Sequence, residues 1–229
     1  MKRTILVVAA HPDDEVLGCG ATMAKHAKEG DAVHVLILAE GITSRDAERK
    51  PGKRVKELGA LAGAAHAANK VLGVRSVTLE KFPDNRLDSV SRLDLVKAIE
   101  QLKKKIKPQI VYTHHAGDVN IDHRCAHDAV TVACRPQPGE SVQTLLFFET
   151  ASSTEWQTRG AKTAFVPNWF VDVSSTLGLK LKALKKYGSE MRPWPHARSY
   201  RGLEHLARWR GASIGKEAAE AFVAARHIL

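Results

Sequence analysis

A short motif near the N-terminus brings an imidazole and two carboxylates together. Residues 11–15 read His-Pro-Asp-Asp-Glu and directly follow an apolar run. His11 and Asp14 are three residues apart, which lets both side chains reach one metal ion at a strand-to-helix turn, and the rigid ring of Pro12 helps to fix that turn. Catalytic zinc takes three protein ligands of the histidine and carboxylate type and leaves one position for water. The motif therefore predicts two ligands of a zinc (Zn2+) site.

A histidine-rich segment is predicted to supply the third ligand. Residues 114–123 read His-His-Ala-Gly-Asp-Val-Asn-Ile-Asp-His, and we predict that His123 binds the metal. His127 lies one helical turn further on and could compete, although packing on its helix suits it better. The other imidazoles of the segment are those of His114 and His115.

Asp13 is not needed as a metal ligand and is predicted to be the general base. Water beside a metal ion has a lowered pKa and needs a nearby proton acceptor. Two alternative carboxylates remain: Glu15 is placed to favour a helix N-terminus, and Asp122 could orient a ligand imidazole. Carboxylates at a helix start are also common caps. The pairing with the histidine-rich segment favours catalysis here.

The segments that must position these residues alternate between strand and helix patterns. This alternation predicts βαβ units and an α/β fold with a parallel sheet. Continuous apolar runs such as ILVV and VLIL suit a sheet that is covered on both faces. The expected strands span 5–10, 33–39, 76–79, 110–113 and 144–148, and the expected helices span 18–29, 54–72, 93–106 and 125–134.

Charged or imidazole groups follow four of these strands. Ligands collect at the carboxyl ends of strands in open α/β sheets. The strand ends lead into residues 11–15, toward Arg45, into 83–86 and into 114–123. We therefore expect four independent loops to meet at one edge of the sheet.

The sequence predicts one domain over residues 1–229. Its core spans about 4–150, and residues 151–229 form a C-terminal elaboration that helps to wall a cleft. Residues 149–169 have the composition of a loop with room for one strand, and 177–187 and 217–226 are expected to be helical.

The composition is that of an ordinary soluble globular protein. The 229 residues are 44% hydrophobic, and no apolar run approaches the roughly 20 residues that span a bilayer, so we expect no stable membrane insertion. The N-terminal apolar run passes straight into the metal motif, which favours a first strand over a signal peptide. We therefore expect a cytoplasmic protein. The three cysteines are expected to be free thiols.

The net charge of +10 leaves room for an anionic partner. The densest basic run, residues 103–107, is expected to be the solvated end of a helix rather than a nucleic-acid site. Only 6% of residues are aromatic, which disfavours base-stacking platforms. We therefore expect a small-molecule partner, which the charge allows to be anionic, and no nucleic acid.

Residues 7–21 closely resemble the opening motif of the PIG-L/LmbE-like zinc deacetylases, the relatives of N-acetylglucosaminyl-phosphatidylinositol de-N-acetylase. The resemblance continues through Pro-Asp-Asn at 83–85 and Asn-Ile-Asp-His at 120–123 and so covers at least residues 4–150. The tail resembles one bacterial branch of the family. The resemblance implies a Rossmann-like three-layer fold and hydrolysis of an acetamido group on N-acetylglucosamine or a related amino sugar.

Carried over position by position, the resemblance gives the zinc ligands and the base already named. It also implies that the Asp84 loop holds sugar hydroxyls, and Arg45 is a candidate for substrate contact. Many family members have a histidine where this chain has Asn120, which could donate a hydrogen bond to an oxyanion but cannot act as an acid.

The acid that protonates the leaving amine must therefore be another group. The candidates are His196, His115 (which is also a candidate for substrate contact) and Asp13 itself. Some relatives complete the pocket from a neighbouring subunit, so His196 could act in trans in a homo-oligomer.

Two rival functions remain. One is a metal-dependent amidase that acts on another acylated amine, such as an antibiotic, a thiol conjugate or a glycolipid. The other is a non-catalytic nucleotide-binding module, which is disfavoured because no Gly-x-Gly-x-x-Gly follows the first strand. The basic charge favours a phosphorylated or nucleotide-linked sugar as substrate.

Overall fold

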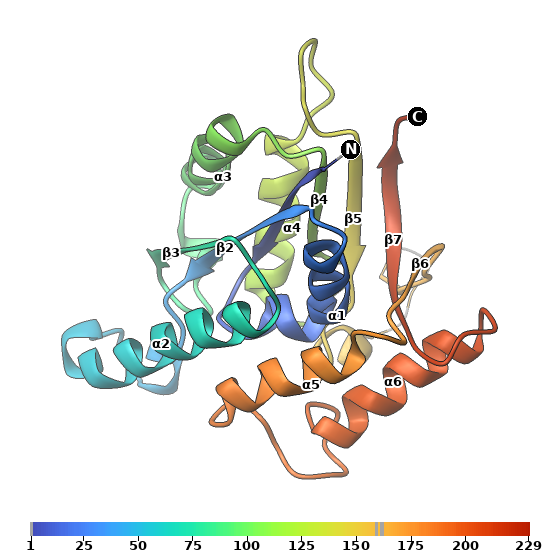
Figure 1. Cartoon of the computed structure of the whole chain (residues 1–229). Coiled ribbons are helices and arrows are strands. Elements are labelled where there is room, and N and C mark those ends of the chain that lie inside the picture. Colours follow the sequence, from blue (N-terminus) through green and yellow to red (C-terminus); the bar gives the residue numbers. More distant parts are fainter. Residues whose placement is uncertain (1, 159, 161–162) are drawn as a thin grey trace.

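A seven-stranded sheet forms the centre of the computed structural model, which describes residues 2–158, 160 and 163–229 (Figure 1). The strand order is β3-β2-β1-β4-β5-β7-β6. The first five strands in this order are parallel, and β7 runs antiparallel to both β5 and β6. This confirms the predicted α/β fold with a mostly parallel sheet. The strands are β1 (Thr4–Ala9), β2 (Ala32–Ala39), β3 (Ser76–Phe82), β4 (Ile110–His114), β5 (Thr144–Phe148), β6 (Trp169–Asp172) and β7 (Ala219–His227).

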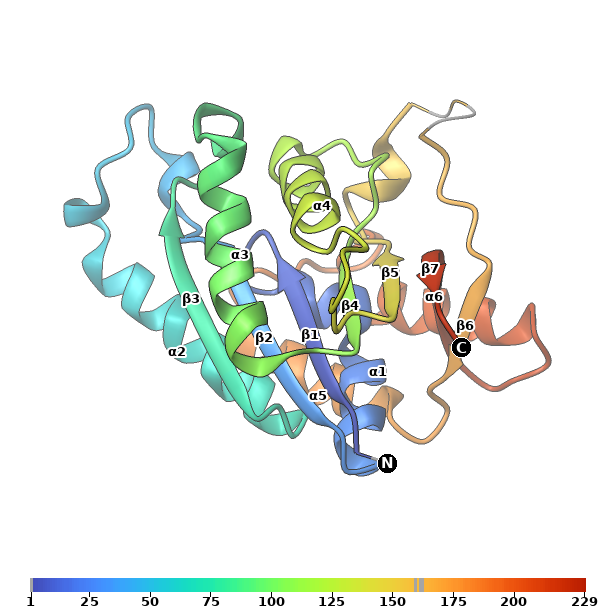
Figure 2. The ribbon, with the colours of Figure 1, turned by 90° about the horizontal axis from the view of Figure 1, so that it is seen from above.

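Helices cover both faces of this sheet (Figure 2). Side chains of α3 and α4 belong to the hydrophobic core on one face, and side chains of α1, α2, α5 and α6 contribute to the core on the other. No helix among the described residues is long and apolar enough to cross a membrane. The helices are α1 (Asp14–Lys28), α2 (Val55–Val71), α3 (Arg92–Ile106), α4 (Ile121–Ala133), α5 (Leu177–Leu184) and α6 (Tyr200–Ala212).

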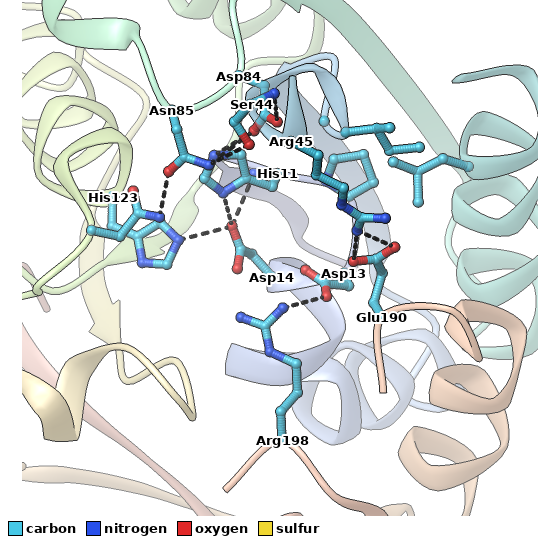
Figure 3. A pocket seen from close by; sticks show the side chains of 15 residues that line it. His11, Asp13, Asp14, Ser44, Arg45, Asp84, Asn85, His123, Glu190 and Arg198 are labelled. Atoms are coloured by element: carbon cyan, nitrogen blue, oxygen red, sulfur yellow. Dashed lines mark hydrogen bonds and ion pairs between the residues drawn. The ribbon is translucent and has the colours of Figure 1, made fainter. Parts of the chain in front are cut away.

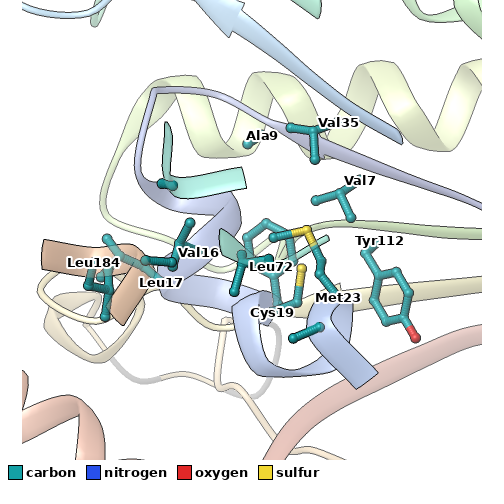
Figure 4. Close-up of a cluster of buried hydrophobic side chains, with 14 of the residues drawn as sticks. Val7, Ala9, Val16, Leu17, Cys19, Met23, Val35, Leu72, Tyr112 and Leu184 are labelled. Carbon is teal, nitrogen blue, oxygen red and sulfur yellow. The ribbon is translucent and has the colours of Figure 1, made fainter. Parts of the chain in front are cut away.

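The alternation of side chains along β1 explains why two cores form. Ile5 and Val7 join the core under α1, whereas Leu6 and Val8 join the core under α3 and α4. All four side chains are fully buried. In Figure 4, Val7 lies among side chains from β2, β4 and α1. β1, whose side chains are apolar on both faces, lies between β2 and β4 in the interior of the sheet. The loop that follows β1 therefore leaves the sheet near the middle of its carboxyl edge.

A buried ion pair supports α1 at a break in the helix. The backbone of Cys19 leaves the helical conformation (φ −144°, ψ 25°). Glu220 on β7 accepts hydrogen bonds from two backbone N–H groups just after the break, at 2.7 and 3.2 Å. Lys180 on α5 donates to the carbonyl of Leu17 before the break (2.7 Å) and to Glu220 (2.6 Å). These two side chains satisfy backbone groups that an unbroken helix would pair internally.

The C-terminal part differs from the expectation in two places. The sequence predicts a helix over residues 217–226, but β7 is a strand at that position. The alanine-rich sequence favours a helix, but the pairing of β7 with β5 on one side and β6 on the other overrides this local preference. Nothing in the sequence pattern predicted α6. Within the predicted loop 149–169, Arg159, Ala161 and Lys162 lie outside the described residues.

Candidate metal centre and active site

A cavity of about 190 Å³ lies at the carboxyl ends of β1, β2 and β4, where the sequence placed the converging loops (Figure 3). The C-terminal part adds two charged side chains to its wall. The lining residues are His11, Pro12, Asp13, Asp14, Gly41, Ile42, Ser44, Arg45, Leu61, Asp84, Asn85, Asn120, His123, Glu190 and Arg198.

Three side chains in this cavity can hold one metal ion. The Asp14 Oδ2 atom lies 3.1 Å from His11 Nδ1 and 3.2 Å from His123 Nε2. Candidate ligand atoms of these residues all lie within 4.8 Å of one another. Two imidazole nitrogens and one carboxylate are the ligand set of a catalytic zinc site. The donor types and their convergence therefore fit the ion that the sequence predicts.

A second group shares His11 and contains Asp84 and Asp122. It would use the other ring nitrogen, His11 Nε2, which lies 3.0 Å from Asp122 and 3.4 Å from Asp84. Asp122 also accepts a hydrogen bond from the backbone N–H of Leu87 (2.8 Å). These contacts suit a carboxylate that orients the His11 ring while the opposite nitrogen binds metal.

The ring of His123 is held in the same way. Its Nδ1 atom lies 3.1 Å from Asp118, which is fully buried. Asp118 is itself fixed by the hydroxyl of Thr154 (2.8 Å) and by the backbone N–H of Asn120 (2.8 Å), and the hydroxyl of Ser153 also donates to it. Sequence reasoning gave Asp118 no role, although its position in the loop before His123 was a usable signal.

Asp13 lies beside the candidate metal ligands in an unusual backbone conformation. Its φ angle is 114°, in the left-handed region. Burial raises the pKa of its carboxyl well above the usual value, and the Arg198 guanidinium, 3.0 Å from Asp13 Oδ2, opposes part of that rise. A carboxylate whose pKa is raised is a better proton acceptor near neutral pH. Arg198 lies 185 residues away along the chain, and nothing in the sequence pattern linked it to Asp13.

The far wall of the cavity is polar and its charges are paired. Arg45 donates two hydrogen bonds to Glu190, at 2.7 and 3.0 Å. Asp84 accepts from the backbone N–H of Ser44 (2.9 Å). Both arginines of the lining, Arg45 and Arg198, therefore face a carboxylate. Sequence reasoning missed Glu190 as well.

Asn120 lines the cavity and also begins a helix. Its side-chain oxygen accepts from the backbone N–H of Asp122 (2.8 Å), so α4 starts at Ile121 rather than at residue 125. Its amide nitrogen donates to Asn85 (2.9 Å). These contacts hold the amide group at the cavity wall.

The remaining candidate histidines lie outside the cavity lining. His115 is buried with its ring edge against Phe165, with centroids 5.3 Å apart. His196 packs against Trp156 (5.6 Å), and its Nδ1 accepts from the backbone N–H of Arg198 (3.0 Å). Neither side chain lines the cavity, so within this chain neither is placed as the acid.

Two further imidazoles that could have competed for the metal are engaged elsewhere. His114 accepts a hydrogen bond from the backbone N–H of Ala10 (2.9 Å) and stacks on His123 at 4.0 Å. The Nδ1 atom of His127 lies 3.0 Å from the backbone carbonyl of His114, to which it donates. His114 Nε2 lies 3.6 Å from Asp14 Oδ2, but it already accepts the hydrogen bond from Ala10, and His123 Nε2 comes closer to Asp14 Oδ2, at 3.2 Å.

Residues 6–134 match the family described as PIG-L: GlcNAc-PI de-N-acetylase. The chain belongs to the PIG-L family. It is 31% identical over 197 residues to the uncharacterized deacetylase YaiS of Escherichia coli, covering 82% of this chain and 92% of that protein. It is 27% identical over 244 residues to the 1D-myo-inositol 2-acetamido-2-deoxy-alpha-D-glucopyranoside deacetylase of Rhodococcus erythropolis, covering 82% and 81%.

The fold also occurs in a protein with another activity. GalB, the 4-carboxy-2-hydroxymuconate hydratase of Pseudomonas putida, superposes with a TM-score of 0.77 at 21% identity, covering 100% of this chain and 98% of that one. At this identity the likeness concerns the fold alone.

Membership of the PIG-L family and its deacetylase relatives identify the chain as a hydrolytic N-deacetylase, which confirms the family and enzyme class predicted from the sequence. PIG-L deacetylases depend on a metal, and His11, Asp14 and His123 form a group that could bind one. The non-catalytic nucleotide-binding alternative is thereby disfavoured.

Proposed function

We propose that this PIG-L protein is a zinc-dependent hydrolase that removes the acetyl group from an N-acetylglucosamine-like sugar and releases acetate. The observation that carries the proposal is the convergence of His11, Asp14 and His123 beside the carboxylate of Asp13, which is not part of the candidate ligand group. The amino-sugar relative from Rhodococcus supports the substrate class.

The metal ligands would be His11 through Nδ1, Asp14, and His123 through Nε2. A bound zinc would supply Lewis acidity, which polarises an amide carbonyl and lowers the pKa of water. Asp118 and Asp122 hold the two imidazoles through their other nitrogens and so select the tautomers that can bind metal.

Asp13 would accept the proton of the attacking water as the new C–O bond forms at the acetamide carbon. The amide of Asn120 is available to donate a hydrogen bond to the oxygen that gains negative charge. When the C–N bond breaks, the amine needs a proton, and Asp13 is the acid within the cavity that has just received one. We therefore assign both proton transfers to Asp13 and neither to His115 or His196.

The polar wall would bind the sugar. Arg45 can donate hydrogen bonds to sugar hydroxyls, and Asp84 and Glu190 can accept them. Since each arginine of the lining already faces a carboxylate, the cavity offers a phosphate no unpaired cation among its described residues. We therefore propose a sugar that is uncharged near its acetamido group, rather than the anionic sugar that the net charge of +10 suggests.

A panel of acetylated sugars tests this proposal. Acetate release would be measured for N-acetylglucosamine, its glycosides, its phosphates and its nucleotide conjugates, with the zinc-loaded and the chelator-treated protein. We expect turnover of a neutral sugar that is lost with zinc and restored by adding it. A preference for the phosphorylated or nucleotide-linked sugars would contradict the proposal that the substrate is an uncharged sugar. Acetate release from other acylated amines alone would support the amidase alternative.

A hydratase is the second candidate, because the chain is also 25% identical over 208 residues to the 4-oxalmesaconate hydratase of Pseudomonas putida, covering 85% of this chain and 77% of that protein. Its reaction would add water to a carbon–carbon double bond and release no acetate. Loss of ultraviolet absorbance from unsaturated polycarboxylic acids such as carboxymuconates would reveal it. The paired arginines of the cavity disfavour such polyanionic substrates.

A further inference from the structure

The carboxylate of Glu15 lies behind the active site and contacts the backbone of the proposed base. The Glu15 side chain is fully buried and does not line the cavity. Its Oε2 atom accepts a hydrogen bond from the backbone N–H of Asp13 (3.1 Å). Its Oε1 atom accepts from the hydroxyl of Tyr187 (2.7 Å) and from the amide of Asn69 (2.8 Å).

The residue that Glu15 contacts needs such support. Asp13 adopts φ 114° and ψ −29°, a left-handed conformation that is costly for a residue with a side chain. Such conformations persist only where surrounding contacts hold them. Asp13 also precedes the first residue of α1, so the helix provides no partner for its N–H group.

We propose that Glu15, held by Tyr187 and Asn69, is a positioning residue that keeps Asp13 in this conformation and thereby aims its carboxylate at the reacting water. This inference rests on the proposed function, because it assumes that Asp13 is the base. The three supporting side chains come from α1, from α2 and from the 3-10 turn Lys185–Tyr187.

The burial of Glu15 separates this role from ordinary helix capping. An acidic residue in the first turn of a helix usually faces water and contributes through the helix dipole. Here the carboxylate is fully buried, where it needs hydrogen bonds to offset the loss of water. Three donors supply them, and one donor is the strained residue itself.

The arrangement gives the C-terminal part a function in catalysis. Tyr187 reaches the backbone of Asp13 through Glu15, and Arg198 contacts the carboxylate of Asp13 directly. Residues far along the chain thus hold the base from two sides.

Tyr187→Phe tests the proposal with a matched control. The change removes one donor to Glu15 and keeps the ring that packs in the core. Tyr112→Phe is the control, because Tyr112 is also buried in that core and loses one hydrogen bond, to His26 (2.9 Å). We expect kcat to fall about tenfold in Y187F, with KM, zinc content and far-UV circular dichroism unchanged, since a small displacement of a reacting group is costly. Y112F should lose comparable thermal stability and keep kcat.

A second series shows whether Tyr187 acts through Asp13. Glu15→Gln should lower kcat about 100-fold while zinc content stays at the wild-type level. In the Asp13→Asn background, Y187F should not reduce the residual rate further, because the group that it positions is already absent. Equal losses of kcat in Y187F and Y112F, or a further loss in the D13N background, would overturn the inference.

The outcomes also separate this inference from the proposed function. If D13N abolishes turnover but the single variant Y187F keeps the wild-type kcat, Asp13 is the base but is held by other contacts. If D13N keeps wild-type turnover, Asp13 is not the base and this inference fails, whereas the proposed function fails only if the zinc-loaded wild type releases no acetate from any acetylated sugar.

Discussion

At the scale of single residues, the site combines ligands that local sequence brings together with carboxylates that only folding supplies. His11 and Asp14 are neighbours in one motif, whereas His123 arrives from the start of α4, after β4. The ring nitrogens that do not face Asp14 lie against Asp122 in His11 and against Asp118 in His123. Each imidazole therefore has one nitrogen for a metal and one for a carboxylate, as in other histidine–metal sites.

Replacing Asp13 by asparagine tests the base without disturbing the site. Asparagine tolerates the left-handed conformation as aspartate does. We expect D13N to keep its zinc and to lose about 1,000-fold in kcat, because a general base typically contributes factors of this order. Metal analysis and an acetate-release assay provide the two measurements. Retention of substantial activity would exclude Asp13 as the base.

Asp118→Asn tests how the third ligand is held. The variant keeps the shape of the side chain but weakens the hydrogen bond that orients His123. Loss of such a partner typically lowers metal affinity by about 10- to 100-fold, and we expect a change of this size in zinc titrations. Asp128→Asn, an exposed change on α4, is the control and should bind zinc like the wild type. Equal affinities for D118N and the wild type would contradict the assignment.

At the scale of elements, the break in α1 is the feature that most needs support. The first half of the helix carries Asp14 and Glu15, and the helix packs along β2. Lys180 and Glu220 bridge the break from α5 and β7. Because both side chains are buried away from water, each charge is stabilised by the opposite charge of its partner.

Lys180→Met is therefore expected to destabilise the protein. It leaves the Glu220 carboxylate buried without its cation, which typically costs about 3–5 kcal/mol. Chemical denaturation measures the change, and Lys182→Met, at an exposed position on the same helix, is the comparison. The double variant K180M/E220Q should recover part of the loss. A stability within about 1 kcal/mol of the wild type for K180M would show that the pair is dispensable.

At the scale of the whole molecule, a bound metal should link the start of α1 to the start of α4 and so stabilise the folded protein. The loop after β1 and the start of α1 carry two of the proposed ligands, and the start of α4 carries the third. An ion that binds only the folded state stabilises it by about 2.7 kcal/mol at a concentration of about 100 Kd. We expect zinc to raise the Tm of the metal-free protein, and His123→Ala to remove most of this response. Equal responses of H123A and the wild type would place the ion elsewhere.

Much of this organisation could be predicted from the sequence. The apolar runs of β1, β2, β4 and β5 are local signals, and the motif at 11–15 places its groups at a strand end without reference to the rest of the chain. The prediction failed at β7, because an alanine-rich segment favours a helix when it is considered alone. Its strand conformation depends on hydrogen bonds to β5 and β6.

The sequence by itself determined the family, the α/β fold and the candidate ligands, since these depend on short motifs and on periodic burial of apolar side chains. Only the tertiary structure decided that Arg198 and Glu190 line the cavity, that Tyr187 contacts Glu15 behind it, and that His115 and His196 lie outside its lining. The physical reason is that hydrogen bonds and ion pairs between distant residues leave no periodic pattern in the chain. They become visible only when packing has placed the partners together.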